Sequence, residues 1–211
     1  MRDRWFGSWK TAYLFFAIAL LVSVCFKLSQ LGSRELWLDE TYSAFTSHLR
    51  FRELLHATFG DVHPPLFPIL LWGWVRIAGD TQAMLRLFSV LWNLGAMVAV
   101  FFLARRALGA LFGSFAAILF ALSPMLFVYS LEVRNYMLFL FLLSCLLLVH
   151  WKVAVERSPS RALIVLYGLL AAALFFTHYL GIFLVFGLFV HWGIVSIHSR
   201  DQWPGPASPV C

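Results

Sequence analysis

The sequence predicts an all-α integral membrane protein with about six transmembrane helices. Of its 211 residues, 62% are hydrophobic and 12% are charged, whereas soluble domains average roughly half apolar and a quarter charged. The apolar residues also gather in runs, and the short polar segments between these runs hold most of the basic residues. The net charge of +6 is therefore better explained by membrane topology than by a nucleic-acid partner.

Six apolar runs are candidates for spans, each of which needs about 20 helical residues. They are Ala12–Leu31, Leu85–Leu103, Leu108–Val128, Tyr136–Trp151, Ala162–Thr177 and Tyr179–Ile197. The fourth and fifth runs are short and need their flanking residues or a locally thinner bilayer. The first run follows basic residues, as a signal peptide would, but no small-residue cleavage site comes after it, so a retained helix is favoured.

The segment 32–84 between the first two runs is predicted to be a long outer loop that contains interfacial helices. Its first part has apolar residues at helical spacing beside charged ones, which is typical of an amphipathic surface helix: Leu38, Tyr42, Phe45 and Leu49. The later stretch Pro65–Val75 is apolar but too short to span. Its leading prolines favour a helix start, so we expect this helix to lie on the membrane face or dip into it.

The basic residues orient the chain with its N-terminus in the cytoplasm. In this orientation the short inner segments are rich in Lys and Arg, as the positive-inside rule requires: Arg2, Arg4, Lys10, Arg105, Arg106, Lys152, Arg157, Arg161 and Arg200. Residues 1–198 then form one membrane domain, and the proline-rich segment 199–211 is a short cytoplasmic tail. The compact loops favour a bacterial plasma membrane.

The same orientation gathers polar residues from three separate turns on the outer face. They are Asp39, Glu40, Asp61, His63, Glu132, Arg134 and His178. Carboxylates and histidines beside spans are costly unless they are solvated, paired or functional. A shared site is therefore a natural interpretation.

Asp39-Glu40 has two interpretations. In the structural one, Asp39 lies near the N-cap of a helix that begins at Thr41. In the functional one, a carboxylate here is a general base that takes a proton from an acceptor hydroxyl, or it is a ligand of a divalent metal. A site at the membrane face suits a substrate that a lipid delivers.

The other outer turns also have alternatives. His63, before Pro64-Pro65, either belongs to a plain helix start or faces an anionic phosphate together with the amides of the following helix. In the turn 130–136, Glu132 and Arg134 are either an interfacial pair or a phosphate grip in which Glu132 holds Arg134. Tyr136 suits an aromatic belt.

His178 ends the next outer turn, and its neighbours raise the odds that it is functional. His150, His191 and His198 lie toward the inner face without polar neighbours in the sequence, so no role is assigned to them. Cys25 and Cys145 lie inside apolar runs, so neither a disulfide nor a metal site is inferred from them.

The order and spacing of these motifs resemble the GT-C glycosyltransferases, in the branch of the protein O-mannosyltransferases and the bacterial aminoarabinose transferases. The resemblance covers roughly residues 10–198. It rests first on an acidic pair in the first outer loop (residues 39–40) and on His-Pro-Pro-Leu (63–66). A span that opens with arginine and ends in Arg-Arg-Ala-Leu-Gly follows (86–109). The last two motifs are Ser-x-Glu-x-Arg-x-Tyr (130–136) and Thr-His-Tyr (177–179).

The resemblance implies a membrane enzyme that moves a sugar from a polyprenyl-phosphate donor to a hydroxyl of a lipid, glycan or protein acceptor at the outer face. It gives Asp39, with Glu40, the role of base or metal-associated carboxylate and places His63 near the donor phosphate. Arg134 and His178 are phosphate or metal contacts, with Glu132 and Tyr136 beside them. Some relatives hold a metal through a glutamate where this chain has Val62, so a divalent metal is left open.

Two alternatives remain at this point. The family's enzymes have more spans and a soluble C-terminal domain, so the chain corresponds to the N-terminal half of that fold and could be an inactive remnant. A non-enzymatic membrane protein such as half a transporter is the other alternative. It is less favoured because transporters place functional charges near the bilayer midplane, whereas here the polar clusters lie at the ends of the runs.

Overall fold

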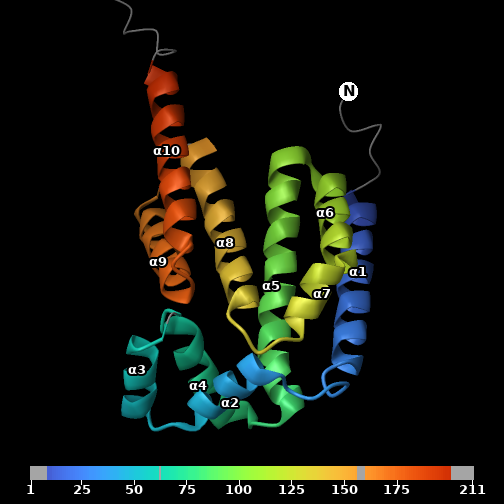
Figure 1. Ribbon diagram of the computed structural model, residues 1–211. Coiled ribbons are helices and arrows are strands. Elements are labelled where there is room, and N and C mark those ends of the chain that lie inside the picture. Colours follow the sequence, from blue (N-terminus) through green and yellow to red (C-terminus); the bar gives the residue numbers. More distant parts are fainter. Residues whose placement is uncertain (1–8, 62, 156–159, 201–211) are drawn as a thin grey trace, which may run out of the picture.

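The computed structural model describes residues 9–61, 63–155 and 160–200, and in this part of the chain the regular elements are helices, with no strand. In chain order they are α1 (Trp9–Ser29), α2 (Leu38–His48), α3 (Phe51–Phe59), α4 (Leu66–Ala78), α5 (Gln82–Leu108), α6 (Ala110–Leu122), α7 (Pro124–Ser130), α8 (Tyr136–His150), the π-helical turn η1 (Trp151–Val155), α9 (Arg161–Thr177) and α10 (Gly181–Arg200) (Figure 1). The all-α prediction is confirmed. Most of the predicted tail 199–211 lies outside the described residues.

Three helical segments are long and apolar enough to cross a membrane: α1 with 21 residues, α5 with 27, and Tyr136–Val155 with 20. A fourth candidate is the pair α6 and α7, which are bent by 64° at their junction. The helices α9 and α10 are apolar but shorter over their apolar parts. Helices thus stand at all six predicted runs, while the count of six spans stays a prediction.

The predicted span Leu108–Val128 is not one straight helix, because the chain breaks at Ser123-Pro124 into α6 and α7. Pro124 has no backbone N–H and its ring disfavours a continuing helix. The hydroxyl of Ser123 instead accepts a hydrogen bond from the backbone N–H of Leu126 at 3.4 Å, as an N-cap does.

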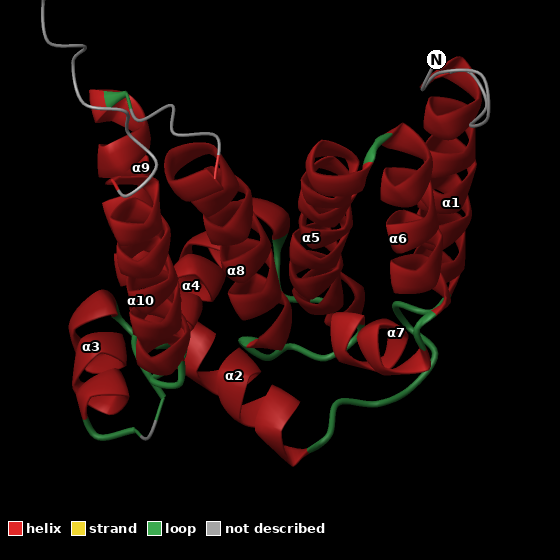
Figure 2. Cartoon of the chain, turned by 90° about the horizontal axis from the view of Figure 1, so that it is seen from above, coloured by secondary structure: helices red, strands yellow, loops and turns green. Residues whose placement is uncertain are grey.

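The central helices α5 and α8 pack against each other, with α1 and α6 on one side of them and α9 and α10 on the other, as both views show (Figures 1 and 2). Gly95 of α5 permits close approach, since a Cβ there would lie 2.8 Å from the ring of Phe141 on α8. The apolar core between these helices continues through Leu138, Leu142 and Leu146.

The predicted outer loop 32–84 folds into α2, α3 and α4, which lie together at one end of the bundle (Figure 1). The predicted short helix after Pro64-Pro65 is confirmed as α4. It is fixed to the bundle by the indole N–H of Trp74, which donates to the carbonyl of Met84 at 2.8 Å. Phe67 of α4 also packs on Phe88 of α5.

Helix α2 turns its polar side toward the protein and its apolar side outward. Its buried residues are Glu40, Ser43, Thr46 and Ser47. Leu38 and Phe45, by contrast, are 82% and 62% exposed. This arrangement agrees with a helix whose apolar face contacts lipid, and it places the carboxylate of Glu40 inside the protein.

Candidate functional site

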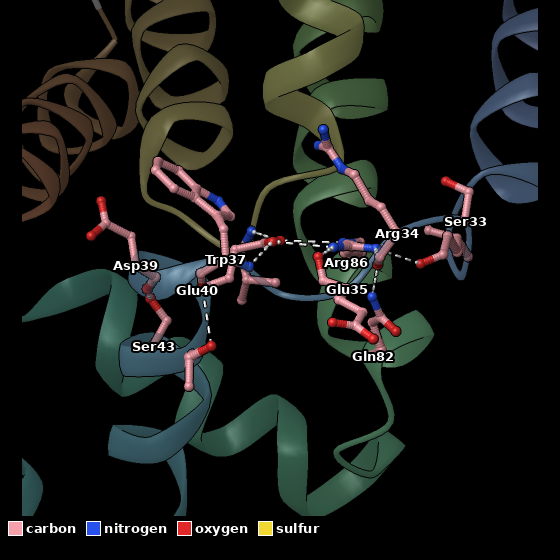
Figure 3. Close-up of polar contacts among 12 residues, drawn as sticks. Ser33, Arg34, Glu35, Trp37, Asp39, Glu40, Ser43, Gln82 and Arg86 are labelled. Atoms are coloured by element: carbon pink, nitrogen blue, oxygen red, sulfur yellow. Dashed lines mark hydrogen bonds and ion pairs between the residues drawn. The ribbon is translucent and has the colours of Figure 1, made fainter.

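The neighbouring carboxylates Asp39 and Glu40 both lie in the first turn of α2, and they point apart (Figure 3). Asp39 lies near the N-cap as predicted, but the predicted helix start at Thr41 is wrong, because α2 starts at Leu38 with Trp37 as its N-cap. It is Glu40 that caps the helix, since its carboxylate accepts the backbone N–H of Trp37 at 3.3 Å. The two acids therefore occupy different environments.

Glu40 is fully buried and forms a bidentate ion pair with Arg86 of α5. Arg86 Nε donates to Oε1 at 3.2 Å and Nη2 donates to Oε2 at 3.1 Å, with both side chains at 0% exposure. Such a fork-to-carboxylate arrangement satisfies charge and geometry together. Glu40 is thus engaged in a structural contact in this conformation.

Arg86 also ties down the segment that leads into α2. Its remaining donors reach three backbone carbonyls: Leu31 at 3.2 Å, Arg34 at 2.6 Å and Glu35 at 3.0 Å. Sequence reasoning did not give Arg86 this role. A signal was available, because a charged residue inside an apolar run demands a partner.

Glu40 connects α2 to the turn between α7 and α8 as well. Its Oε1 accepts the backbone N–H of Val133 at 3.1 Å. Arg134 follows directly in the chain, so this hydrogen bond positions the backbone from which Arg134 extends. The buried pair Glu40–Arg86 therefore underlies the placement of both Asp39 and Arg134.

Arg134 lies between two residues that come from distant parts of the sequence. Its Nη2 is 3.5 Å from Asp39 Oδ2 and 3.5 Å from His63 Nε2. The Asp39 side chain is 42% exposed and that of Arg134 is 14% exposed. Both contacts are at the long end of hydrogen-bonding distance, so a stronger anionic partner could displace them.

The tautomer of His63 follows from its neighbours. Its Nδ1 is 3.2 Å from Asp61 Oδ1, and its backbone N–H donates to the same oxygen at 3.2 Å. Because a carboxylate only accepts, the Nδ1 position carries the proton and Nε2 presents a lone pair to Arg134. Asp61 also accepts a hydrogen bond from Tyr42, and burial followed by the charge of Asp61 raises the pKa of that phenol.

His178, at the C-terminal end of α9, faces the His63 ring at a centroid distance of 6.3 Å. Its Nδ1 accepts the backbone N–H of Leu180 at 3.2 Å, which leaves the Nε2 position as the donor of the neutral ring. Burial, and to a lesser degree repulsion from His63, lowers the pKa of His178. The neutral form is therefore favoured.

His63 and Arg134 line a small cavity of about 30 Å³, which is room for a water molecule or a small polar group. Its lining comes from α2, from α4 with the turn before it, and from the turn between α7 and α8: Tyr42, Ser43, Thr46, Asp61, His63, Pro64, Phe67, Pro68, Leu71, Arg134 and Asn135. Asn135 was not predicted as a site residue. It ties this turn to α9 through a 2.9 Å hydrogen bond to the Thr177 carbonyl.

Several buried polar atoms of the turn 131–135 have no hydrogen-bond partner in the described part of the protein. They are Glu132 Oε2, Arg134 Nε and Asn135 Oδ1. Burial is the main cause that raises the pKa of Glu132, with Arg34 opposing it. Orphaned buried polar atoms are unusual and often mark positions that a ligand or water satisfies.

The predicted side-chain pair between Glu132 and Arg134 is wrong for the described residues, since Arg134 contacts Asp39 instead. Tyr136 stands beside Tyr129 with ring centroids 4.9 Å apart, and it does not line the cavity. The structure thus brings Asp39, Arg134, His63 and His178 together, and of these four His63 and Arg134 line the cavity.

The carboxylates of the cluster are engaged by neighbouring side chains. No group of three or more His, Cys, Asp or Glu side chains with suitable spacing occurs among the described residues. The Asp39 carboxylate faces the Arg134 guanidinium, and Asp61 is engaged by His63 and Tyr42. Val62 lies outside the described residues.

At the other end of the bundle, sequence reasoning missed a contact between two histidines. His150 Nε2 of α8 is 2.9 Å from His191 Nδ1 of α10, and His150 Nδ1 is 3.3 Å from the hydroxyl of Tyr167 on α9. The sequence predicted no role for His150 or His191, and the structure gives both of them polar partners. The partners are far apart in the sequence, so no local sequence pattern predicts these contacts.

Comparison with known proteins identifies a family for the chain. The sequence model of a family described as dolichyl-phosphate-mannose-protein mannosyltransferase matches residues 62–204, a region that includes His63, Arg134 and His178. No curated protein and no solved structure gives a significant match. The matched region covers more than half of the chain. The chain therefore belongs to the dolichyl-phosphate-mannose-protein mannosyltransferase family, a family of GT-C membrane glycosyltransferases.

Proposed function

We propose that the chain transfers a sugar from a polyprenyl-phosphate donor to an acceptor hydroxyl, with Asp39 as general base. The observation that carries the proposal is the contact between Asp39 and Arg134 at 3.5 Å, with His63 on the other side of the same guanidinium nitrogen. A carboxylate that can accept a proton thus stands beside a cation that can bind phosphate.

The proposed reaction is a direct displacement at the anomeric carbon. Asp39 takes the proton of the acceptor hydroxyl while the oxygen of that hydroxyl forms a bond to the anomeric carbon. The bond from that carbon to the phosphate oxygen breaks, and polyprenyl phosphate leaves with the bonding electrons. The guanidinium of Arg134 stabilises the negative charge that develops on the departing phosphate.

The two histidines complete the phosphate contacts in this proposal. His178 offers its Nε2 proton in the neutral form, a consequence of the hydrogen bond at its Nδ1. His63 holds Arg134 by accepting at Nε2. Loose contacts at 3.5 Å allow the guanidinium to exchange a protein partner for the donor phosphate.

The proposal gives Glu40 a different role from that of Asp39. Its oxygens are occupied by Arg86, the N–H of Val133 and the N–H of Trp37. We therefore assign it a positioning role, in which it holds Asp39 and Arg134 in register. This division follows from burial, since Glu40 is inaccessible and Asp39 is partly exposed.

A lipid donor fits the position of the site. The helices α2 and α4 surround the cavity, and the exposed apolar face of α2 suits the membrane surface. By the positive-inside rule this surface is the outer one. The acceptor is a hydroxyl of a lipid, a glycan or a protein.

The test is a transfer assay in membranes from cells that express the full chain, beside membranes that carry the empty vector. One arm supplies radiolabelled polyprenyl-phosphate sugars, and the other supplies sugar nucleotides under conditions that block lipid-linked donor synthesis. We expect chain-dependent transfer only in the first arm. Transfer from nucleotides alone would contradict the donor class, and transfer from neither donor would contradict activity of this chain.

A further inference from the structure

A basic crevice lies between α5 and α8, at the end of the bundle opposite to α2–α4. The two helices touch at Gly95 and Phe141 and then diverge toward the far end (Figure 1). There α5, α8 and the following turn η1 border a cavity of about 400 Å³, lined by Phe102, Arg105, Arg106, Leu148 and Lys152. We call this set the basic crevice.

The crevice combines positive charge with apolar walls. Three of its five lining side chains are cationic and none is a carboxylate, while Phe102 and Leu148 form the apolar part. Among the described residues, neither Arg105 nor Lys152 forms an ion pair with a carboxylate. The charges of Arg105 and Lys152 are therefore not neutralised by a carboxylate of the described residues.

Close packing holds the cationic residues on the α5 wall in place. A Cβ at Gly113 of α6 would lie 2.8 Å from the carbonyl oxygen of Phe101 and 3.0 Å from Cβ of Arg105, so α6 supports the backbone here. The guanidinium of Arg105 lies 5.1 Å from the ring centroid of Tyr13 and 6.0 Å from that of Phe102. These aromatic contacts orient the guanidinium without neutralising it.

We propose that the basic crevice binds the phosphate of an anionic phospholipid from the leaflet opposite to the candidate catalytic site. Basic pockets between transmembrane helices bind such head groups. The apolar walls favour a lipid over a free anion, because they offer contact area for an acyl chain just below the phosphate. The positive-inside rule explains why basic residues occur at this end, but it does not require them to line one cavity from two helices.

The binding test uses the purified full chain in a neutral detergent, titrated with fluorescent phosphatidylglycerol and, separately, with the matching phosphatidylcholine. We expect phosphatidylglycerol to bind more tightly and Lys152→Gln to weaken it about fivefold, the effect expected for one basic residue near an anionic lipid. The double variant Arg105→Gln/Arg106→Gln should weaken it further. Inorganic phosphate should compete poorly.

The matched control is Arg161→Gln, a basic residue at the start of α9 that does not line the crevice. It should bind phosphatidylglycerol like the parent chain. Equal affinity for the two lipids would overturn the proposal. It would also be overturned if Arg161→Gln weakened phosphatidylglycerol binding as much as Lys152→Gln does, because the lipid would then be attracted to the whole basic surface. Strong competition by inorganic phosphate would show an anion site and overturn the lipid assignment. If Lys152→Gln does not fold, Lys152→Arg takes its place. Normal binding by Lys152→Arg together with weaker binding by the double variant would support the proposal, and normal binding by both would overturn it.

Discussion

The carboxylate of Glu40 and the guanidinium of Arg86 meet in a bidentate contact at 3.2 and 3.1 Å, with both side chains wholly buried. The pair joins α2 to α5, and through the N–H of Val133 it also joins α2 to the turn that carries Arg134. The two adjacent acids thus have different roles, because Glu40 holds these elements together while Asp39 remains accessible.

Breaking this pair should destabilise the protein strongly. Glu40→Gln leaves the Arg86 charge buried without a counterion, and losses of about 3–5 kcal/mol are typical of such changes. Thermal unfolding in detergent measures the effect. Arg50→Gln is the matched control, since Arg50 forms an exposed pair with Glu53 on α3, with 86% and 43% exposure, and should leave the unfolding temperature unchanged. An unchanged unfolding temperature in Glu40→Gln would contradict the role of the pair.

Glu132 should give the stability a distinct pH dependence. Burial, the largest cause, raises its pKa in the folded protein above the ordinary value of 4.5. Between these two values the folded state keeps a proton that the unfolded state has lost, so stability falls as pH rises through this window. Glu132→Gln should remove that fall, whereas Glu35→Gln, at an exposed position, should retain it. Identical pH profiles for the parent chain and Glu132→Gln would contradict the prediction.

Two glycines should respond in opposite ways to the same substitution. Gly113→Ala forces the α5 backbone away, because the new Cβ would lie 2.8 Å from the carbonyl oxygen of Phe101. A Cβ at Gly168 in α9, by contrast, would have no heavy atom of another element within 4 Å. Gly168→Ala should therefore stabilise the helix, by about 0.5–1 kcal/mol. Unfolding temperatures that change in the same direction would contradict the close α5–α6 contact.

Arg134 should matter most for the departing phosphate. Arg134→Gln removes the cation that stabilises developing charge, and the loss in kcat/KM should be of the order of 10²–10³-fold, as for other groups of this kind. Arg134→Lys should recover part of the activity, because it keeps the charge but not the forked donors. Arg52→Gln, at an exposed position on α3, serves as the control. Full activity in Arg134→Gln would exclude the proposed contact.

Much of the fold follows from local rules. Proline and apolar spacing predict α4 and α2, and the apolar runs predict the positions of the long helices. The break at Ser123-Pro124 was readable too, since serine followed by proline is a common helix start, but the length of the run obscured it.

The site was only partly predictable. The sequence placed Asp39, His63, Arg134 and His178 on one face, and the structure brings them into one cluster. The sequence could not show that Asp39 and Glu40 have different roles, because the partner of Glu40 is Arg86, 46 positions further along the chain. Pairing at that distance depends on how α2 packs on α5, and no local pattern encodes it.

The central claim is that Asp39 accepts the proton of the acceptor hydroxyl. The most direct test measures kcat and KM for sugar transfer by Asp39→Asn, with Asp80→Asn as control, since Asp80 is an exposed carboxylate paired with His48 and not with Arg134. The account predicts that Asp39→Asn lowers kcat by about 10²–10⁴-fold, the usual contribution of a general base, with little change in KM for the donor. In Asp80→Asn, neither kcat nor KM should change. Equal kcat in Asp39→Asn and the parent chain would contradict the account.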